Sequence, residues 1–208
     1  MINLLIAYYL AESLRALPFI SRLAGLVKVL ETDRFSKDKN GADRRVHRFP
    51  ISLESEPSTC TTSGRQYPDL VPDQSERLIV YFEDGNARSV DGRAKWQSTL
   101  RLVAWGNSAL FEAGDSPKAA IPAMIMNAIG NTLRTAKESG RGPIQNLSVT
   151  ITGVPDSNTN LFARYTYEQT RSQFLFPPYF AFGIDLTVTY TLQHDCLDTL
   201  TYLTPAEC

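Results

Sequence analysis

The chain has 208 residues, of which 43% are hydrophobic and 21% are charged, a composition typical of one soluble globular domain rather than a disordered segment. Lys and Arg number 21 against 22 Asp and Glu, so net charge gives no support to long-range attraction to nucleic acid or an anionic membrane. No apolar stretch approaches the length that crosses a bilayer, and we expect a single domain over residues 1–208.

The chain opens on an amphipathic helix. Apolar residues between Ile2 and Leu14 recur every three or four positions, which places them on one face of a helix that ends before Pro18. That face must pack on another element. Residues 26–31 then predict a short strand.

Two long polar segments flank an extended one. Residues 33–45 and the proline-bearing residues 54–76 are predicted to be long loops, and the second is a candidate for reaching a partner. Between them, residues 45–54 predict an extended segment. Pro50 favours a sheet edge or a bulge for this segment, because proline cannot donate to a central ladder.

Two strands are predicted in the middle of the chain. The continuous apolar run 78–82 is typical of a strand covered on both faces. After a predicted turn at Asp84-Gly85, the alternating segment from Trp96 to Trp105 is expected to be its antiparallel neighbour. The two tryptophans are nine residues apart and should point to opposite faces, one in the core and the other partly exposed.

A second helix is predicted after this pair. Residues 115–117 offer a helix start, and apolar residues then recur at four-residue spacing. An interior proline costs about 3 kcal/mol, so the regular helix is expected to begin near Ala119, with Pro122 in its first turn. Ser139-Gly140 is expected to end it.

The last part of the chain predicts two further strands. Residues 147–152 and 184–192 alternate apolar with polar residues, as strands with one buried face do. Residues 161–173 could form a short helix that residues 174–180 cannot continue. The order of helix, strands, helix and strands predicts an α+β fold, in which an antiparallel or mixed sheet packs against two main helices.

Residue patterns that carry chemistry are not found. There is no glycine-rich phosphate loop, and residues 106–110 resemble a nucleophile elbow but lack its closing glycine. His47 and His194 each lack a second ligand at metal spacing. We therefore expect no catalytic, cofactor or metal site. Three cysteines have no CxxC spacing and are expected to be reduced thiols: Cys60, Cys196 and Cys208.

Local clusters of charged and aromatic residues are the candidate functional surfaces. The basic residues between 33 and 48 and the acidic residues from 185 to 208 are either solvated surface or patches that meet between subunits. The aromatic segment 174–182 either packs in the core or forms a hydrophobic subunit contact. The candidate subunit contacts are Arg34, Lys37, Lys39, Arg44, Arg45, Tyr67, Phe174, Phe176, Tyr179, Phe180, Asp195 and Asp198.

Three segments resemble a known family of virion proteins. They are the strand Leu78-Ile79-Val80-Tyr81-Phe82-Glu83-Asp84, the strand ending Arg101-Leu102-Val103-Ala104-Trp105-Gly106-Asn107, and Phe176-Pro177-Pro178-Tyr179 leading into Ile184-Asp185-Leu186. Similar patterns occur in virion proteins of tailed phages, and the helix-first layout resembles tail terminator and tail completion (neck) proteins. The resemblance covers about residues 45–195 and consists of strand patterns.

The resemblance implies an α+β subunit that assembles into a ring, commonly a hexamer. Such a ring caps the tail tube and joins it to the head connector, with DNA passing through its lumen, and it would belong to the virion after assembly in the host cytoplasm. The family has no catalytic residue or cofactor to carry over, and no membrane partner is implied. Because the two long loops depart from shorter terminators, a head-tail stopper, collar or baseplate role stays open. An enzyme or small-ligand-binding protein without a recognisable motif is the alternative of another class.

Overall fold

The structure is a computed structural model. The described residues are 2–32, 47–53, 70–90, 95–111, 117–139, 144–155, 161–165 and 176–192. The predicted loop 33–45, most of the predicted loop 54–76 and the C-terminal residues 195–208 lie outside them.

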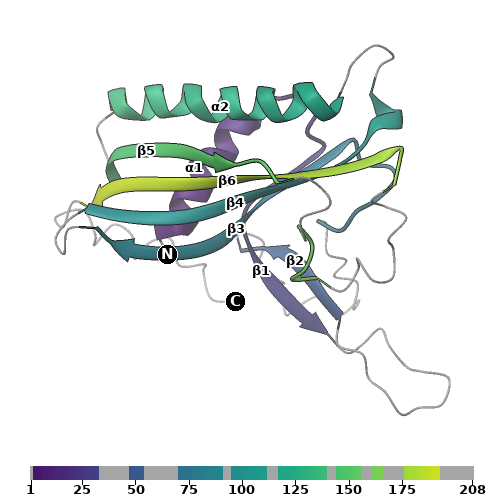
Figure 1. Cartoon of the computed structure of the whole chain (residues 1–208), viewed down its shortest axis with the longest axis horizontal. Helices are drawn as coiled ribbons and strands as arrows, with labels where there is room; N and C mark the ends of the chain where they lie inside the picture. Colours follow the sequence, from purple (N-terminus) through teal and green to yellow (C-terminus); the bar gives the residue numbers. More distant parts are fainter. Residues whose placement is uncertain are drawn as a thin grey trace, which may run out of the picture.

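Two α-helices and one six-stranded sheet make up the described chain (Figure 1). The sheet order is β2-β1-β3-β4-β6-β5. Its neighbouring strands pair antiparallel except β1 and β3, which pair parallel. The predicted α+β fold with a mixed, mostly antiparallel sheet is therefore confirmed. The elements are α1 (Ile2–Leu14), β1 (Arg22–Thr32), β2 (His47–Ser52), β3 (Leu78–Ser89), β4 (Lys95–Asn107), a short 3-10 helix (Ser108–Leu110), α2 (Pro117–Ser139), β5 (Ile144–Gly153) and β6 (Tyr179–Leu192).

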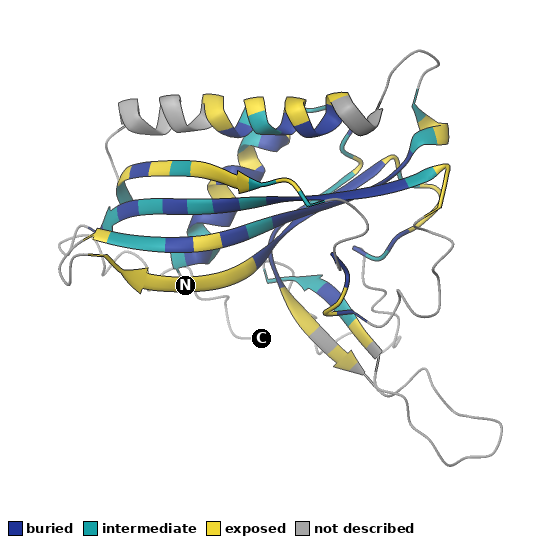
Figure 2. Cartoon of the chain, viewed as in Figure 1, coloured by how far each residue is buried: buried dark blue, intermediate teal, exposed yellow. Residues whose placement is uncertain are grey.

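Both helices pack on the same face of the sheet, around what we call the helix-side core. Ile121, Ile125 and Ile129 of α2 are all buried there, as their four-residue spacing predicts. On β6, alternate residues such as Leu186 and Val188 point into this core while their neighbours point away (Figure 2). The period of two in the sequence thus reports which face of β6 the helices cover.

A smaller core lies on the opposite face, which we call the far face. Tyr81 of β3 and Trp105 of β4 are buried there by Leu161 and Phe162, from a short turn between β5 and β6. Trp96 lies on the helix side, half-buried against the helix-side core. The prediction that the two tryptophans point to opposite faces is confirmed.

The predicted turn at Asp84-Gly85 is wrong. Strand β3 continues to Ser89, and its pairing with β4 shifts register between Asp84 and Ala87, which is a β-bulge. Gly85 lies so close to β4 that an added Cβ would be 2.6 Å from the carbonyl oxygen of Thr99. The glycine therefore serves a close approach of two backbones rather than a chain reversal.

Two helix predictions are also corrected. Helix α2 begins at Pro117 rather than near Ala119, so Pro122 lies in its second turn. The missing N–H of Pro122 removes one helical hydrogen bond there, and burial of Pro122 and Ile121 against the sheet offsets that loss. Residues 161–165 are the described part of the short helix predicted at 161–173, and they form no helix: residues 161–164 are turns.

Candidate functional site

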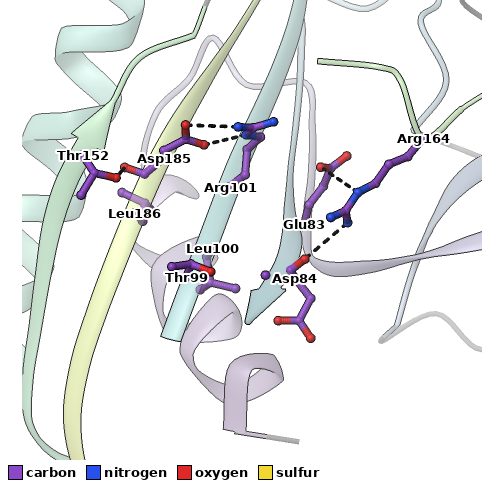
Figure 3. Close-up of a pocket in the computed structure, with 10 residues that line it drawn as sticks. Glu83, Asp84, Thr99, Leu100, Arg101, Thr152, Arg164, Asp185 and Leu186 are labelled. Carbon is purple, nitrogen blue, oxygen red and sulfur yellow. Dashed lines mark hydrogen bonds and ion pairs between the residues drawn. The ribbon is translucent and has the colours of Figure 1, made fainter. Parts of the chain in front are cut away.

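A row of charged side chains crosses the far face of the sheet. The pairing register places Glu83 of β3 opposite Arg101 of β4, and Arg101 opposite Asp185 of β6. Side chains at paired positions share a face, so the three lie side by side (Figure 3). The charges alternate in sign across the row, and Arg101 has a carboxylate on each side.

Arg101 and Asp185 form a two-point ion pair. The Nε atom of Arg101 lies 2.6 Å from Oδ1 of Asp185, and Nη2 lies 3.2 Å from Oδ2. This hydrogen-bonded carboxylate raises the pKa of Arg101. The paired geometry satisfies the carboxylate and the guanidinium with each other.

Glu83 is a buried carboxylate at the other end of the row. Its residue is only 4% exposed, and burial raises the pKa of Glu83 because the charged form loses solvation. Three groups act against that effect by favouring the charged form. The Tyr165 hydroxyl donates to Oε1 at 2.7 Å, Nε of Arg164 lies 3.9 Å from Oε2, and the positive charge of Arg101 lies opposite on β4. Burial also raises the pKa of Tyr165.

The turn at residues 161–165 is held to the sheet by this row and by the smaller core on the far face, which we call the far-side core. Leu161, Phe162 and Tyr165 are buried, and Arg164 donates to the backbone carbonyl of Asp84 at 3.3 Å. The carboxylate of Asp84 in turn accepts a hydrogen bond from the side chain of Asn3 in α1. Glu83 and Asp84 thus connect β3 to the turn and to the first helix.

A cavity of about 360 Å³ opens beside the charged row. Its volume falls in the range of small-molecule sites. Among the residues that the structure describes, no histidine or cysteine lines it, and no cluster of three His, Cys, Asp or Glu is placed to hold a metal ion. The lining residues are Glu83, Asp84, Gly85, Thr99, Leu100, Arg101, Thr152, Arg164, Asp185 and Leu186.

The segment that resembles a nucleophile elbow has a structural role. The hydroxyl of Ser108 donates to the carbonyl of Pro178, and the backbone N–H of Ser108 donates to the same oxygen at 2.8 Å. The side chain of Asn107 accepts from the N–H of Ala109 at 3.1 Å and caps the 3-10 helix. These bonds fasten the end of β4 to the start of β6.

The structure separates the predicted aromatic contacts from one another. Phe176 is 65% exposed, whereas Phe180 is 4% exposed and packs in the helix-side core. Tyr179 is half-buried and stacks on Trp105 with ring centroids 5.3 Å apart. Core packing thus accounts for Phe180, and Phe176 keeps a surface suited to contact. The other predicted contacts lie outside the described residues: Arg34, Lys37, Lys39, Arg44, Arg45, Tyr67, Phe174, Asp195 and Asp198.

Two members of the predicted charge patches are paired within the chain. Nε of Arg48 lies 2.8 Å from Oε1 of Glu31 across the β1–β2 pair, and Asp185 is paired with Arg101. Asp185 belongs to the far face of the sheet rather than to a terminal acidic segment. His47 lies in β2, and His194 and the three cysteines lie outside the described residues.

The charged row itself was not predicted. A signal exists in the sequence, because Glu83 directly follows the apolar run 78–82 and Arg101 interrupts an apolar stretch of β4. A charged residue within a buried strand generally requires a partner. The sequence does not say which partner, because that depends on the strand register.

Comparisons with known proteins give no family. A scan against models of protein families yields no match for this chain, and a search of curated proteins yields none. Among the described residues, no helix is both long and apolar enough to cross a membrane.

Proposed function

We propose that the chain is a virion structural protein of a tailed phage, a tail terminator or neck subunit that forms a ring and joins the tail tube to the head connector. The observation that carries the proposal is the pairing of Arg101 with Asp185 and of Glu83 with Tyr165. These groups bond to one another within the sheet, so we expect function at surfaces rather than at a reaction centre.

The family resemblance supports the proposal. Its three segments fall on β3, β4 and the start of β6, which are adjacent strands of the sheet. They therefore form one contiguous part of the fold. The exposed ring of Phe176 lies just before β6 and offers an apolar group for a neighbouring subunit.

The proposed ring is tested by the mass and shape of the purified protein. Light scattering should give a multiple of the chain mass, and negative-stain images should show closed rings, because head-to-tail contacts close under cyclic symmetry. Added tail tubes should carry these rings at one end. A protein that stays monomeric at high concentration and ignores tail tubes would overturn the proposal, and rings that bind elsewhere would indicate a stopper, collar or baseplate component.

Phe176 provides a sharper variant of the same test. Phe176→Ser removes an exposed apolar ring and should weaken assembly without lowering the thermal midpoint. The control is Tyr8→Ser. Tyr8 is also exposed, at 42%, but it lies on α1, which is outside the three segments that carry the resemblance. Equal loss of assembly in both variants would indicate a general loss of surface hydrophobicity rather than a specific contact.

The cavity favours one second candidate, a binding protein for a small anion. Arg164 is half-exposed there, and its Nε lies 3.9 Å from Oε2 of Glu83, which is beyond hydrogen-bond length, so its guanidinium has donors left for a ligand. Carboxylates or phosphate should then raise the thermal midpoint of the wild type but not of Arg164→Ala. No shift in either protein would remove this candidate.

A further inference from the structure

Strand β5 forms an edge of the sheet that lacks the usual protection. It pairs with β6 on one side, and no described strand pairs with its other side. Its ten residues, Ile144–Gly153, contain no charged residue and no proline. Natural edge strands usually carry such residues, because an unprotected edge can add a strand of another chain.

The hydrogen bonds fix which backbone groups of β5 point outward. The N–H of Gly183 donates to the carbonyl of Pro155 at 2.7 Å, so Gly183 faces the β5 side. In an antiparallel pair the direction alternates from residue to residue, so Thr187 and its partner Thr150 also face each other. The N–H and C=O groups of Val149 and Ile151 therefore point away from β6.

The same reasoning shows that strand β2, at the opposite edge of the sheet, is interrupted on its outer side. The N–H of Leu53 donates to the carbonyl of Leu26 at 2.9 Å, so alternate residues of β2 face away from β1. Pro50, paired with Val29, falls on an outward position and has no N–H to offer. In the part of the chain that the structure describes, the sheet thus has one outer edge available for pairing, at β5, and one that Pro50 interrupts, at β2.

We propose that β5 pairs antiparallel with β5 of a second copy of this chain, about a two-fold axis, and joins two sheets into one. An uncharged strand suits self-pairing, because a charged residue near the axis would meet its own charge. With the axis at Thr150, the threonines lie opposite each other and Val149 pairs with Ile151 of the second copy. This contact goes beyond the proposed ring and does not depend on it.

The outward N–H of Ile151 allows a test that spares the folded monomer. Ile151→Pro removes a donor that β6 does not use, and proline is tolerated at such edge positions. The matched control is Ile151→Ala, which removes the partly exposed side chain, 38% exposed, but keeps the N–H. Each variant is compared with the wild type by sedimentation over a range of concentrations and by thermal denaturation.

The expected result is two-fold association of the wild type and of Ile151→Ala, as a dimer of chains or of rings. Its dissociation constant should be at least about tenfold higher for Ile151→Pro, because the two-fold axis repeats the substitution and two hydrogen bonds are lost at once. The monomer mass at every concentration for the wild type would overturn the inference. So would equal effects of the two variants, or rings in which Ile151→Pro changes nothing, and the last outcome would leave the ring proposal standing.

A disulfide gives an independent readout of the pairing. In a background of Cys60→Ser, Cys196→Ser and Cys208→Ser, Thr150→Cys should form a covalent dimer on mild oxidation, because its side chain is exposed and lies next to the proposed axis. Ala109→Cys, exposed on the 3-10 helix, is the control that reports random collisions. Equal dimer yields at the two positions would contradict pairing through β5.

Discussion

Glu83 lowers the free energy of unfolding by an amount that depends on pH. Its pKa in the folded chain lies above the ordinary value of 4.5 because burial disfavours the charged form. Between the two pKa values the folded chain holds a proton that the unfolded chain has released, so this group makes stability fall as pH rises through that window. Above the pKa of Glu83 in the folded chain, the loss of stability has reached its full size and no longer changes with pH.

Glu83→Gln should remove this dependence. Glutamine keeps an oxygen that can accept from the Tyr165 hydroxyl but has no charge to desolvate. We expect the variant to gain free energy of unfolding relative to the wild type as pH rises from below 4.5 to neutral, and to be the more stable protein at neutral pH. Urea denaturation at several pH values measures this difference, and an advantage that shrinks toward neutral pH would contradict the assignment.

Arg101 and Asp185 should show a measurable coupling. The pair is partly exposed, with side chains 37% and 33% accessible, which limits its value, but its two-point geometry places it at the upper end for such pairs. A double-mutant cycle of Arg101→Ala and Asp185→Ala is expected to give about 1 kcal/mol. Lys95 and Gln97, on the same strand and face, provide positions for control substitutions that should not couple to Asp185.

The sequence could indicate that single residues of the row were unusual, but not that they meet. Glu83, Arg101 and Asp185 are separated along the chain by 18 and 84 positions, counted from their numbers. Only the register of β3, β4 and β6 aligns them, and a slip of one residue would turn Arg101 to the helix side. Arg164 and Tyr165 reach Glu83 from a turn, and the position of that turn follows from packing rather than from any local sequence pattern.

Two glycines should respond to alanine in opposite ways. Gly130 lies in α2, and an added Cβ would meet nothing within 4 Å. Gly130→Ala should therefore raise the free energy of unfolding by about 1 kcal/mol, since glycine is the weaker helix former. Thermal denaturation should show a midpoint about 2 to 4 °C higher, and a lower midpoint would mean that α2 has a close neighbour at this position.

Gly85→Ala should destabilise the bulge in β3. The new Cβ would lie 2.6 Å from the carbonyl oxygen of Thr99, and two strand backbones must move apart to admit it. A loss of about 1 to 3 kcal/mol is expected, as for other overpacked sites. Urea denaturation of this variant beside Gly130→Ala measures the contrast, and an unchanged midpoint would show that residues 84–87 adjust freely.

The regular elements were predictable because their periodicity reports burial. The four-residue spacing of Ile121, Ile125 and Ile129 and the alternation of β6 both follow from contact with the helix-side core. The bulge at Gly85 was not predictable, because Asp-Gly is also a common turn sequence. The distinction depends on how β3 lies against β4, which is information that the dipeptide does not contain.

The two cores share the central strands and should unfold together. Residues of β3 alternate between them, with Val80 and Phe82 in the helix-side core and Ile79 and Tyr81 in the far-side core. Loss of either core exposes one face of the same strand. We therefore expect one cooperative transition for the described elements, in agreement with the single domain predicted from the sequence.

Phe162→Ala and Leu10→Ala test this coupling from the two sides. Each removes a fully buried side chain, from the far-side and the helix-side core respectively, and should cost about 3 to 5 kcal/mol. Within each variant, tryptophan fluorescence and far-ultraviolet circular dichroism should report the same midpoint of unfolding. Two separated transitions in either variant would show that the cores are independent units.

Pro50 has a consequence for the concentrated protein. A sheet that can extend at both edges can recruit copies without limit and grow into a fibre. Among the described strands, a sheet that is interrupted at Pro50 on one edge and available for pairing at β5 on the other admits one neighbour, after which neither outer edge is left to extend. Concentrated solutions should therefore stay clear, which turbidity measured over a range of protein concentrations tests.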